Sequence, residues 1–187
     1  MNEEVELYLE DAEDLMEKAV VHLEKELSGI RAGKANPAIL QSLKVEYYGA
    51  ETPLTQVANV GTSDARTITV QPWEKKMIDP IERAIRNSGL GLNPQNNGEI
   101  IRIIIPMLTE DRRRDLVKQA RNEGESARVA VRSIRKNTNE EFKKMQKDGM
   151  SEDAQKDAED AVQKLTDRFI RKIDELLTAK EKDILTV

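Results

Sequence analysis

The chain has 187 residues, enough for one ordinary domain or two small ones. Hydrophobic residues make up 38% and charged residues 35%, but aromatic residues only 3%, a balance that favours amphipathic helices over an aromatic-rich β-sandwich. The formal net charge is -5. The sequence has no cysteine, which excludes disulfides, thiolate nucleophiles and Cys-ligated metals.

The first thirty residues have the pattern of an amphipathic helix. Apolar residues recur at alternating steps of three and four. These residues are Val5, Leu9, Ala12, Met16, Ala19, Leu23, Leu27 and Ile30. The segment is acidic and lacks the basic region of a signal peptide, and no stretch of the chain approaches the roughly 20 apolar residues of a membrane span. We therefore expect a cytoplasmic protein without a membrane segment.

The periodicity then changes to that of strands. The stretches "LKVEYYG", "TQVANV" and "RTITVQ" alternate or are β-branched, with glycines and prolines between them, and predict three strands. A short helix is expected over residues 80–87, with Ile81, Ala84 and Ile85 facing inward. The stretch "GLGLNPQNNG" predicts a long polar turn, and "EIIRIIIP" predicts a strand that ends at Pro106.

Helical periodicity returns after Thr109, a favourable N-cap followed by two acidic residues. The apolar seam of this helix is Val117, Ala120, Gly124, Ala127, Val131, Ile134, Thr138, Phe142 and Met145. Gly149 is expected to end the helix and Ser151 to cap the next one. The seam of that last helix is Val162, Leu165, Phe169, Ile173 and Leu176.

Three long helices, each with one apolar seam, can bury these seams against one another in a three-helix bundle built from residues 1–31 and 107–187. The strand-rich part, residues 32–106, is then an inserted β/α/β domain, so the fold class is α+β. Two segments connect the domains, residues 31–37 and 105–109, and predict a two-stranded hinge. The hinge residues expected are Ala32, Gly33, Ile105 and Pro106.

The stretch "SARVAVRSIRK" places four cations in the middle of the second long helix of an acidic chain. At 100° per residue, Arg128, Arg132 and Arg135 lie at about -20°, +20° and -40° from Arg121, and Arg114 lies at about +20°. Arginine can grip phosphate oxygens at two points, so this stripe predicts RNA binding. The alternative is that the arginines pair with acidic residues of neighbouring helices.

Five stretches occur in order along nearly the whole chain: "VEYYGAETPLTQVANV", "GLGLNP", "PMLTEDRRRDL", "ARVAVRSIRK" and "VQKLTD". With them the sequence resembles the bacterial ribosome recycling factor family. The resemblance implies an L-shaped molecule, with a three-helix bundle hinged to a small β/α/β domain and an outline similar to a transfer RNA. Members commonly carry more proline before the Leu-Thr-Glu of the hinge than the single Pro106 found here.

The resemblance also implies the activity. Family members enter the post-termination ribosome across the A and P sites, bind large-subunit ribosomal RNA, and split the subunits together with elongation factor G and GTP. The GTP is bound by that partner, so no cofactor, metal or enzymatic activity is expected, and a monomer is expected. The RNA-binding residues expected from the family motifs and the stripe are Arg31, Arg112, Arg113, Arg121, Arg128, Arg132 and Arg135, with most weight on Arg132 and Arg135.

Other functions have weaker support in the sequence. The single histidine, His22, has no nucleophile nearby, and the pairs Glu110/Asp111 and Asp157/Asp160 fit helix capping and solvated faces better than acid–base or metal chemistry. The aromatic residues Tyr47, Tyr48 and Trp73 are expected to pack in the core and its rim, with base stacking as the alternative. A helical adaptor that binds another protein without RNA remains a rival, and it predicts seams left open for other chains.

Overall fold

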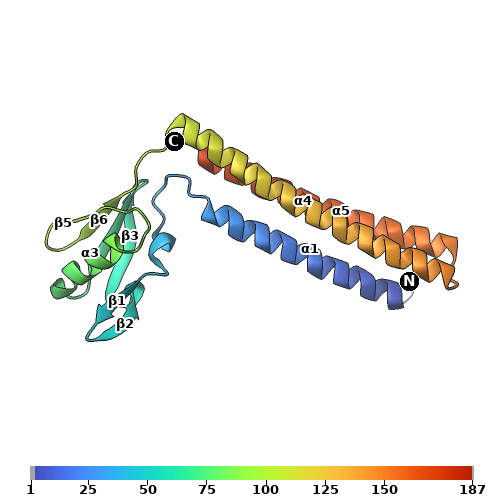
Figure 1. Cartoon of the computed structure of the whole chain (residues 1–187), viewed down its shortest axis with the longest axis horizontal. Helices are drawn as coiled ribbons and strands as arrows, with labels where there is room; N and C mark the ends of the chain where they lie inside the picture. Colours follow the sequence, from blue (N-terminus) through green and yellow to red (C-terminus); the bar gives the residue numbers. More distant parts are fainter. Residues whose placement is uncertain (1–2, 187) are drawn as a thin grey trace. The chain divides into compact units, whose positions relative to one another are not determined.

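The computed structural model describes residues 3–186 and divides into two compact units, each with its own core. One unit is formed by the chain up to Ala32 and from Thr109 onward, and the other by Gly33–Leu108 (Figure 1). The first unit consists of three long helices and the second of strands and short helices. The predicted α+β class is therefore confirmed. Within residues 3–186, no helix is long and apolar enough to cross a membrane.

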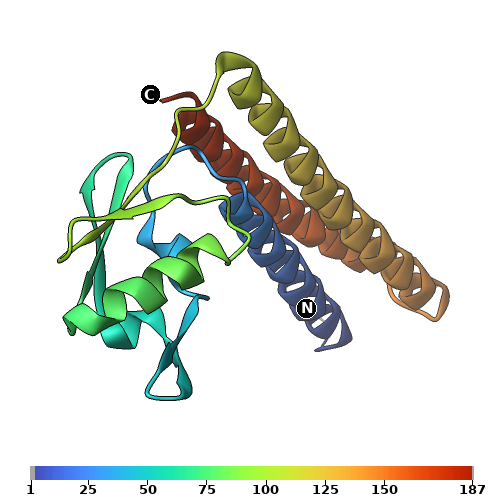
Figure 2. The same ribbon diagram turned by 60° about the vertical axis from the view of Figure 1, so that its left-hand side comes forward.

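Caps and breakers in the sequence set the ends of the long helices. The hydroxyl of Thr109 accepts a hydrogen bond from the backbone N–H of Arg112, and that of Ser151 accepts one from Ala154, both at 3.2 Å. Gly149, at φ +119°, occupies the turn between the two helices that run side by side in opposite directions (Figure 2). The helices are α1 (Glu3–Gly29), α4 (Glu110–Lys147) and α5 (Glu152–Leu185).

The three predicted seams form the core of the bundle. Most seam residues are buried, including Phe142 and Phe169 at 0% exposure. Three positions differ by one residue from the prediction, because Val20, Thr166 and Leu177 are buried where Ala19, Leu165 and Leu176 were expected. A straight helix drifts relative to a strict seven-residue repeat, so the buried residue changes along a long seam. Among residues 3–186 the three seams are buried against one another within one chain, whereas the adaptor predicts seams left open for other chains.

The loss of one helix cap has a defined expected cost. Replacing Ser151 with alanine leaves the Ala154 N–H without its partner, and such a loss costs about 1 kcal/mol. We expect the Ser151→Ala variant to lower the thermal midpoint of the bundle by about 4 °C, measured by far-ultraviolet circular dichroism. Ser126→Ala, on the exposed middle of α4, is the control. An equal loss in both variants would contradict the capping role of Ser151.

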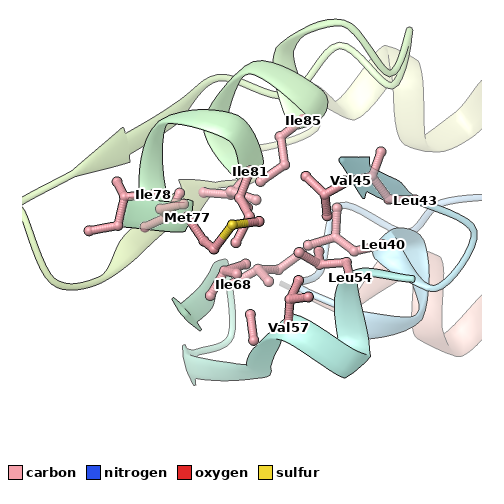
Figure 3. Packing of buried hydrophobic residues seen from close by; sticks show 14 residues of the cluster. Leu40, Leu43, Val45, Leu54, Val57, Ile68, Met77, Ile78, Ile81 and Ile85 are labelled. Carbon is pink, nitrogen blue, oxygen red and sulfur yellow. The ribbon is translucent and has the colours of Figure 1, made fainter. Parts of the chain in front are cut away.

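The second unit is a four-stranded antiparallel sheet of order β3-β4-β6-β5, together with a separate two-stranded hairpin, β1-β2. Buried side chains from α3 and from the segments before β3 pack on residues of the sheet such as Ile68 (Figure 3). The elements are η1 (Pro37–Leu40), β1 (Lys44–Tyr47), β2 (Ala50–Pro53), α2 (Leu54–Val57), β3 (Ala58–Asp64), β4 (Thr67–Pro72), η2 (Lys75–Met77), α3 (Ile78–Arg86), β5 (Pro94–Asn96) and β6 (Ile101–Ile104).

The strand predictions were wrong in three places, and the first is that strand β2 was not expected. The stretch "TQVANV" does not run as one strand, because Leu54–Val57 form a helical turn and β3 starts only at Ala58. This turn buries both Leu54 and Val57 in the core, which a strand could not do at a spacing of three residues. The expected polar turn over residues 89–98 contains the short strand β5, whose residues pair with β6. The expected helix over residues 80–87 is present as α3.

Candidate RNA interface

Helix α4 carries the arginine ridge, which we define as Arg114, Arg121, Arg128, Arg132 and Arg135. The helix is unbroken from Glu110 to Lys147, so the spacing of these residues places them on one side, as predicted. Their surroundings differ along the helix. Ion pairs with α5 involve the first part of the ridge, whereas the second part faces few carboxylates.

Two ridge arginines are paired with α5. Arg121 donates hydrogen bonds to both carboxylate oxygens of Glu181, at 2.6 and 3.1 Å. Arg128 donates from Nε and Nη2 to Asp174, at 3.1 and 2.5 Å, and only 24% of its side chain is exposed. The pKa of Arg121 is raised by its hydrogen bond to Glu181, and the pKa of Arg128 is raised mainly by the one to Asp174. At these two positions the arginines pair with carboxylates of a neighbouring helix, as the alternative predicts.

The next two arginines have no carboxylate partner on α5 among the described residues. Arg132 has one carboxylate contact, from its Nη1 to Glu125 Oε1 at 3.3 Å within the same helix. Arg135 donates to the neutral side-chain oxygen of Gln163 on α5, at 3.0 Å. Half of the Arg132 side chain is exposed. Both guanidinium groups therefore keep much of their capacity to bind an anion.

The other predicted arginines lie near the ends of helices. Arg113 donates to the backbone oxygens of Ile184 and Thr186, at 2.7 and 3.4 Å, and so caps the C-terminal end of α5. Arg114 lies 3.7 Å from the carboxylate of Glu110, one turn away on the same helix. The side chains of Arg112 and Arg31 are exposed, at the start of α4 and just after α1. The structure thus does not gather all seven predicted arginines into one cluster.

Two surface hollows lie along the ridge and differ in charge. The paired hollow, of about 530 Å³, is lined by Arg121, Asn122, Glu125, Arg128, Asp174, Leu177, Thr178 and Glu181. The basic hollow, of about 480 Å³, is lined by Arg132, Ser133, Arg135, Lys136, Asn139, Glu140 and Lys143. The paired hollow has two arginines and three carboxylates, whereas the basic hollow has four cations and one carboxylate. An anion is therefore favoured in the basic hollow.

The predicted list of RNA-binding residues left out three residues of the basic hollow, Lys136, Asn139 and Lys143, although Lys136 belongs to the basic stretch "SARVAVRSIRK". They follow Arg132 by four, seven and eleven residues and therefore lie on the same side of the helix. Extending the ridge pattern beyond Arg135 would have found them. The side-chain oxygen of Asn139 is buried without a hydrogen-bond partner among the described residues. Burying an unpaired amide oxygen costs free energy, so the fold alone does not explain this asparagine.

Residues considered for other chemistry show no site. Within the described part of the chain, no group of three or more His, Asp or Glu residues is placed to hold a metal ion. His22 is exposed, 4.0 Å from Glu26. Glu110 and Asp111 occupy the first turn of α4, as expected for residues that stabilise a helix N-terminus.

The aromatic residues of the second unit are less buried than predicted. Tyr47 is half-buried and donates to Glu74 at 2.6 Å, which lowers the pKa of Glu74 and raises that of Tyr47. Tyr48 and Trp73 are exposed at 72% and 67%, so neither belongs to the core. The ammonium of Lys76 lies 4.0 Å from the centre of the Tyr48 ring, which gives this exposed ring a cation–π partner within the chain.

Comparisons with known proteins agree on one family. The family model described as ribosome recycling factor matches residues 23–185. The ribosome-recycling factor of Flavobacterium psychrophilum is 54% identical over 187 residues, all of both chains. A solution structure of a ribosome recycling factor covers both chains completely with 40% identity and a TM-score of 0.80. A chain from models of the T. thermophilus ribosome recycling factor and E. coli elongation factor G, bound to the E. coli post-termination complex, is 47% identical, with a TM-score of 0.63 and coverage of 97% and 99%.

Proposed function

The chain belongs to the ribosome recycling factor family, and on that basis we propose that it recycles post-termination ribosomes. The bundle binds large-subunit ribosomal RNA across the A and P sites and, with elongation factor G and GTP, separates the subunits. The relative bound to the post-termination complex together with elongation factor G supports these partners. The GTP belongs to elongation factor G, so the chain needs no cofactor or covalent chemistry of its own. It acts as a monomer in the cytoplasm.

One observation carries the RNA-binding part of the proposal, namely the excess of cations in the basic hollow. Phosphate contacts position a protein on RNA without reading its sequence, and the arginine fork is suited to them. Arg132 and Arg135 make the principal contacts, and Lys136 and Lys143 extend them along the helix. The full proposed set is Arg31, Arg112, Arg113, Arg121, Arg128, Arg132 and Arg135 with these two lysines.

The ion pairs suggest different roles for the two parts of the arginine ridge. Arg121 and Arg128 hold α4 against α5, because their charge-assisted hydrogen bonds reach carboxylates of that helix. Arg121 and Arg128 bind RNA only where a phosphate replaces their carboxylate partners or binds beside them. Arg113 likewise keeps the end of α5 in place. The strongest phosphate contacts therefore come from the second part of the ridge.

The proposed hinge is supported by two backbone hydrogen bonds that fix the first and last segments of the second unit. The N–H of Ala35 donates to the oxygen of Ala65 at 2.9 Å, and the N–H of Ile105 donates to that of Arg66 at 2.7 Å. The same turn thus fixes the first and last segments of the unit. We assign the bending to Ala32, Gly33 and Pro106, with Ile105, directly after β6, as the anchor. Gly33 has φ +72°, which only glycine adopts at little cost.

Light scattering of post-termination 70S ribosomes tests the proposal directly. With ribosomes and elongation factor G from Flavobacterium psychrophilum, we expect scattering to fall when the chain and GTP are both added. Omitting GTP, elongation factor G or the chain should leave the ribosomes intact. Intact ribosomes in the complete mixture would overturn the proposed function.

A further inference from the structure

Glu125 lies between the two parts of the arginine ridge and contacts both. Its Oε2 is 3.2 Å from Nη1 of Arg128, and its Oε1 is 3.3 Å from Nη1 of Arg132. It lines the paired hollow and contacts Arg132, which lines the basic hollow. About half of its side chain is exposed, so a partner that reaches Arg132 also approaches Glu125.

The two arginines depend on Glu125 to different degrees. Arg128 has two hydrogen bonds to Asp174 and keeps them if Glu125 is lost. For Arg132, Glu125 is the one carboxylate within ion-pair distance among residues 3–186. The charge of Glu125 therefore acts mainly on Arg132, a residue to which we assign RNA binding.

This ion pair contributes little to folding. Both side chains are half exposed, and exposed ion pairs add little to stability because water and salt screen them. A phosphate, by contrast, would bind Arg132 close to the Glu125 carboxylate. The negative charges of the phosphate and the Glu125 carboxylate would repel each other there. To bind the phosphate fully, the Arg132 guanidinium must give up its contact with Glu125. Glu125 thus opposes the RNA contact more than it supports the fold.

We propose that Glu125 is a built-in competitor for RNA phosphate, which holds Arg132 in the free protein and weakens its grip in the complex. The inference rests on the proposed function, since a factor that acts on successive ribosomes must leave each large subunit after splitting. A carboxylate beside the principal phosphate contact lowers the affinity and speeds departure. It does so without removing the arginines that position the bundle.

The Glu125→Gln variant tests this role, because glutamine keeps the size of the side chain and removes its charge. We expect the variant to bind purified large ribosomal subunits about three- to tenfold more tightly at low salt, with slower dissociation. The gain should shrink as salt rises, because screening weakens the repulsion. Fluorescently labelled protein gives both the equilibrium affinity and the dissociation rate.

Two further variants make the result specific. Glu123→Gln makes the same change on the same helix, about 200° around from Arg121, and should leave the affinity nearly unchanged. In the Glu125→Gln/Arg132→Ala double variant the gain should disappear, because the arginine that Glu125 opposes is absent. Equal or weaker binding by Glu125→Gln, or a gain that persists without Arg132, would overturn the inference. A wild-type chain that does not bind large subunits at all would instead overturn the proposed function.

Discussion

Ribosome splitting is expected to fall by at least about a hundredfold when Arg132 and Arg135 are both replaced by alanine. Each guanidinium is proposed to make a charge-assisted hydrogen bond to phosphate, and such bonds contribute about 1.5–3 kcal/mol. The fold should survive, because the ion pairs that join α4 to α5 come from Arg121 and Arg128. Light scattering with elongation factor G and GTP measures the loss, and circular dichroism checks the helices.

A matched pair of cations on the bundle provides the control. Arg168 and Lys172 lie on α5 and pair with Glu13 and Glu17 of α1, on the side that faces that helix. The Arg168→Ala/Lys172→Ala variant removes the same charge and should split ribosomes at nearly the wild-type rate. If both double variants lose activity equally, the effect is one of net charge, and the assignment to the basic hollow fails.

Lysine substitutions separate charge from geometry at the same positions. Lysine keeps the positive charge but lacks the planar fork that binds two phosphate oxygens. We expect the Arg132→Lys/Arg135→Lys variant to lie between wild type and the alanine variant in splitting rate. The salt dependence of large-subunit binding should become shallower in the alanine variant by about two contacts and change less in the lysine variant. Identical behaviour of the two variants would show that the fork is essential.

Local signals in the sequence predicted the helices and their ends well. Thr109 and Ser151 cap helices because a side-chain hydroxyl next to an amphipathic pattern satisfies a free backbone N–H, and this depends only on neighbouring residues. The turn Leu54–Val57 was missed because tertiary packing decides its conformation. A short run of apolar and β-branched residues fits a strand or a helical turn until the core that receives it is known.

The sequence predicted that the arginines share one side of α4, but it did not predict their charged partners. A helical projection placed the arginines on one side of α4, which the structure bears out. It could not show that Glu181 and Asp174 would meet Arg121 and Arg128, since that requires the register between two helices far apart in sequence. The distinction between a paired and a basic hollow is therefore a product of tertiary structure.

The register between α4 and α5 depends on the close contact of Gly124 with Leu177. Loss of this contact should have the largest effect on the stability of the bundle. A Cβ atom on Gly124 would lie 2.2 Å from Cδ1 of Leu177 and 2.8 Å from its Cγ, in the buried contact between α4 and α5. Alanine at this position would gain about 1 kcal/mol of helix propensity, which partly offsets the clash. Leucine adds far more volume, so we expect Gly124→Leu to destabilise the bundle by about 3 kcal/mol or more, measured by denaturant unfolding.

A second substitution shows whether the clash is the cause. Leu177→Ala alone should cost about 2–5 kcal/mol by leaving a cavity, yet combined with Gly124→Leu it makes room for the new side chain. The double variant should therefore be at least about 1 kcal/mol more stable than the sum of the single effects. Strictly additive effects would mean that the two residues do not touch. Since the ion pairs of Arg121 and Arg128 lie on either side of this contact, a rescued core should also restore the ridge, and with it the affinity for large ribosomal subunits.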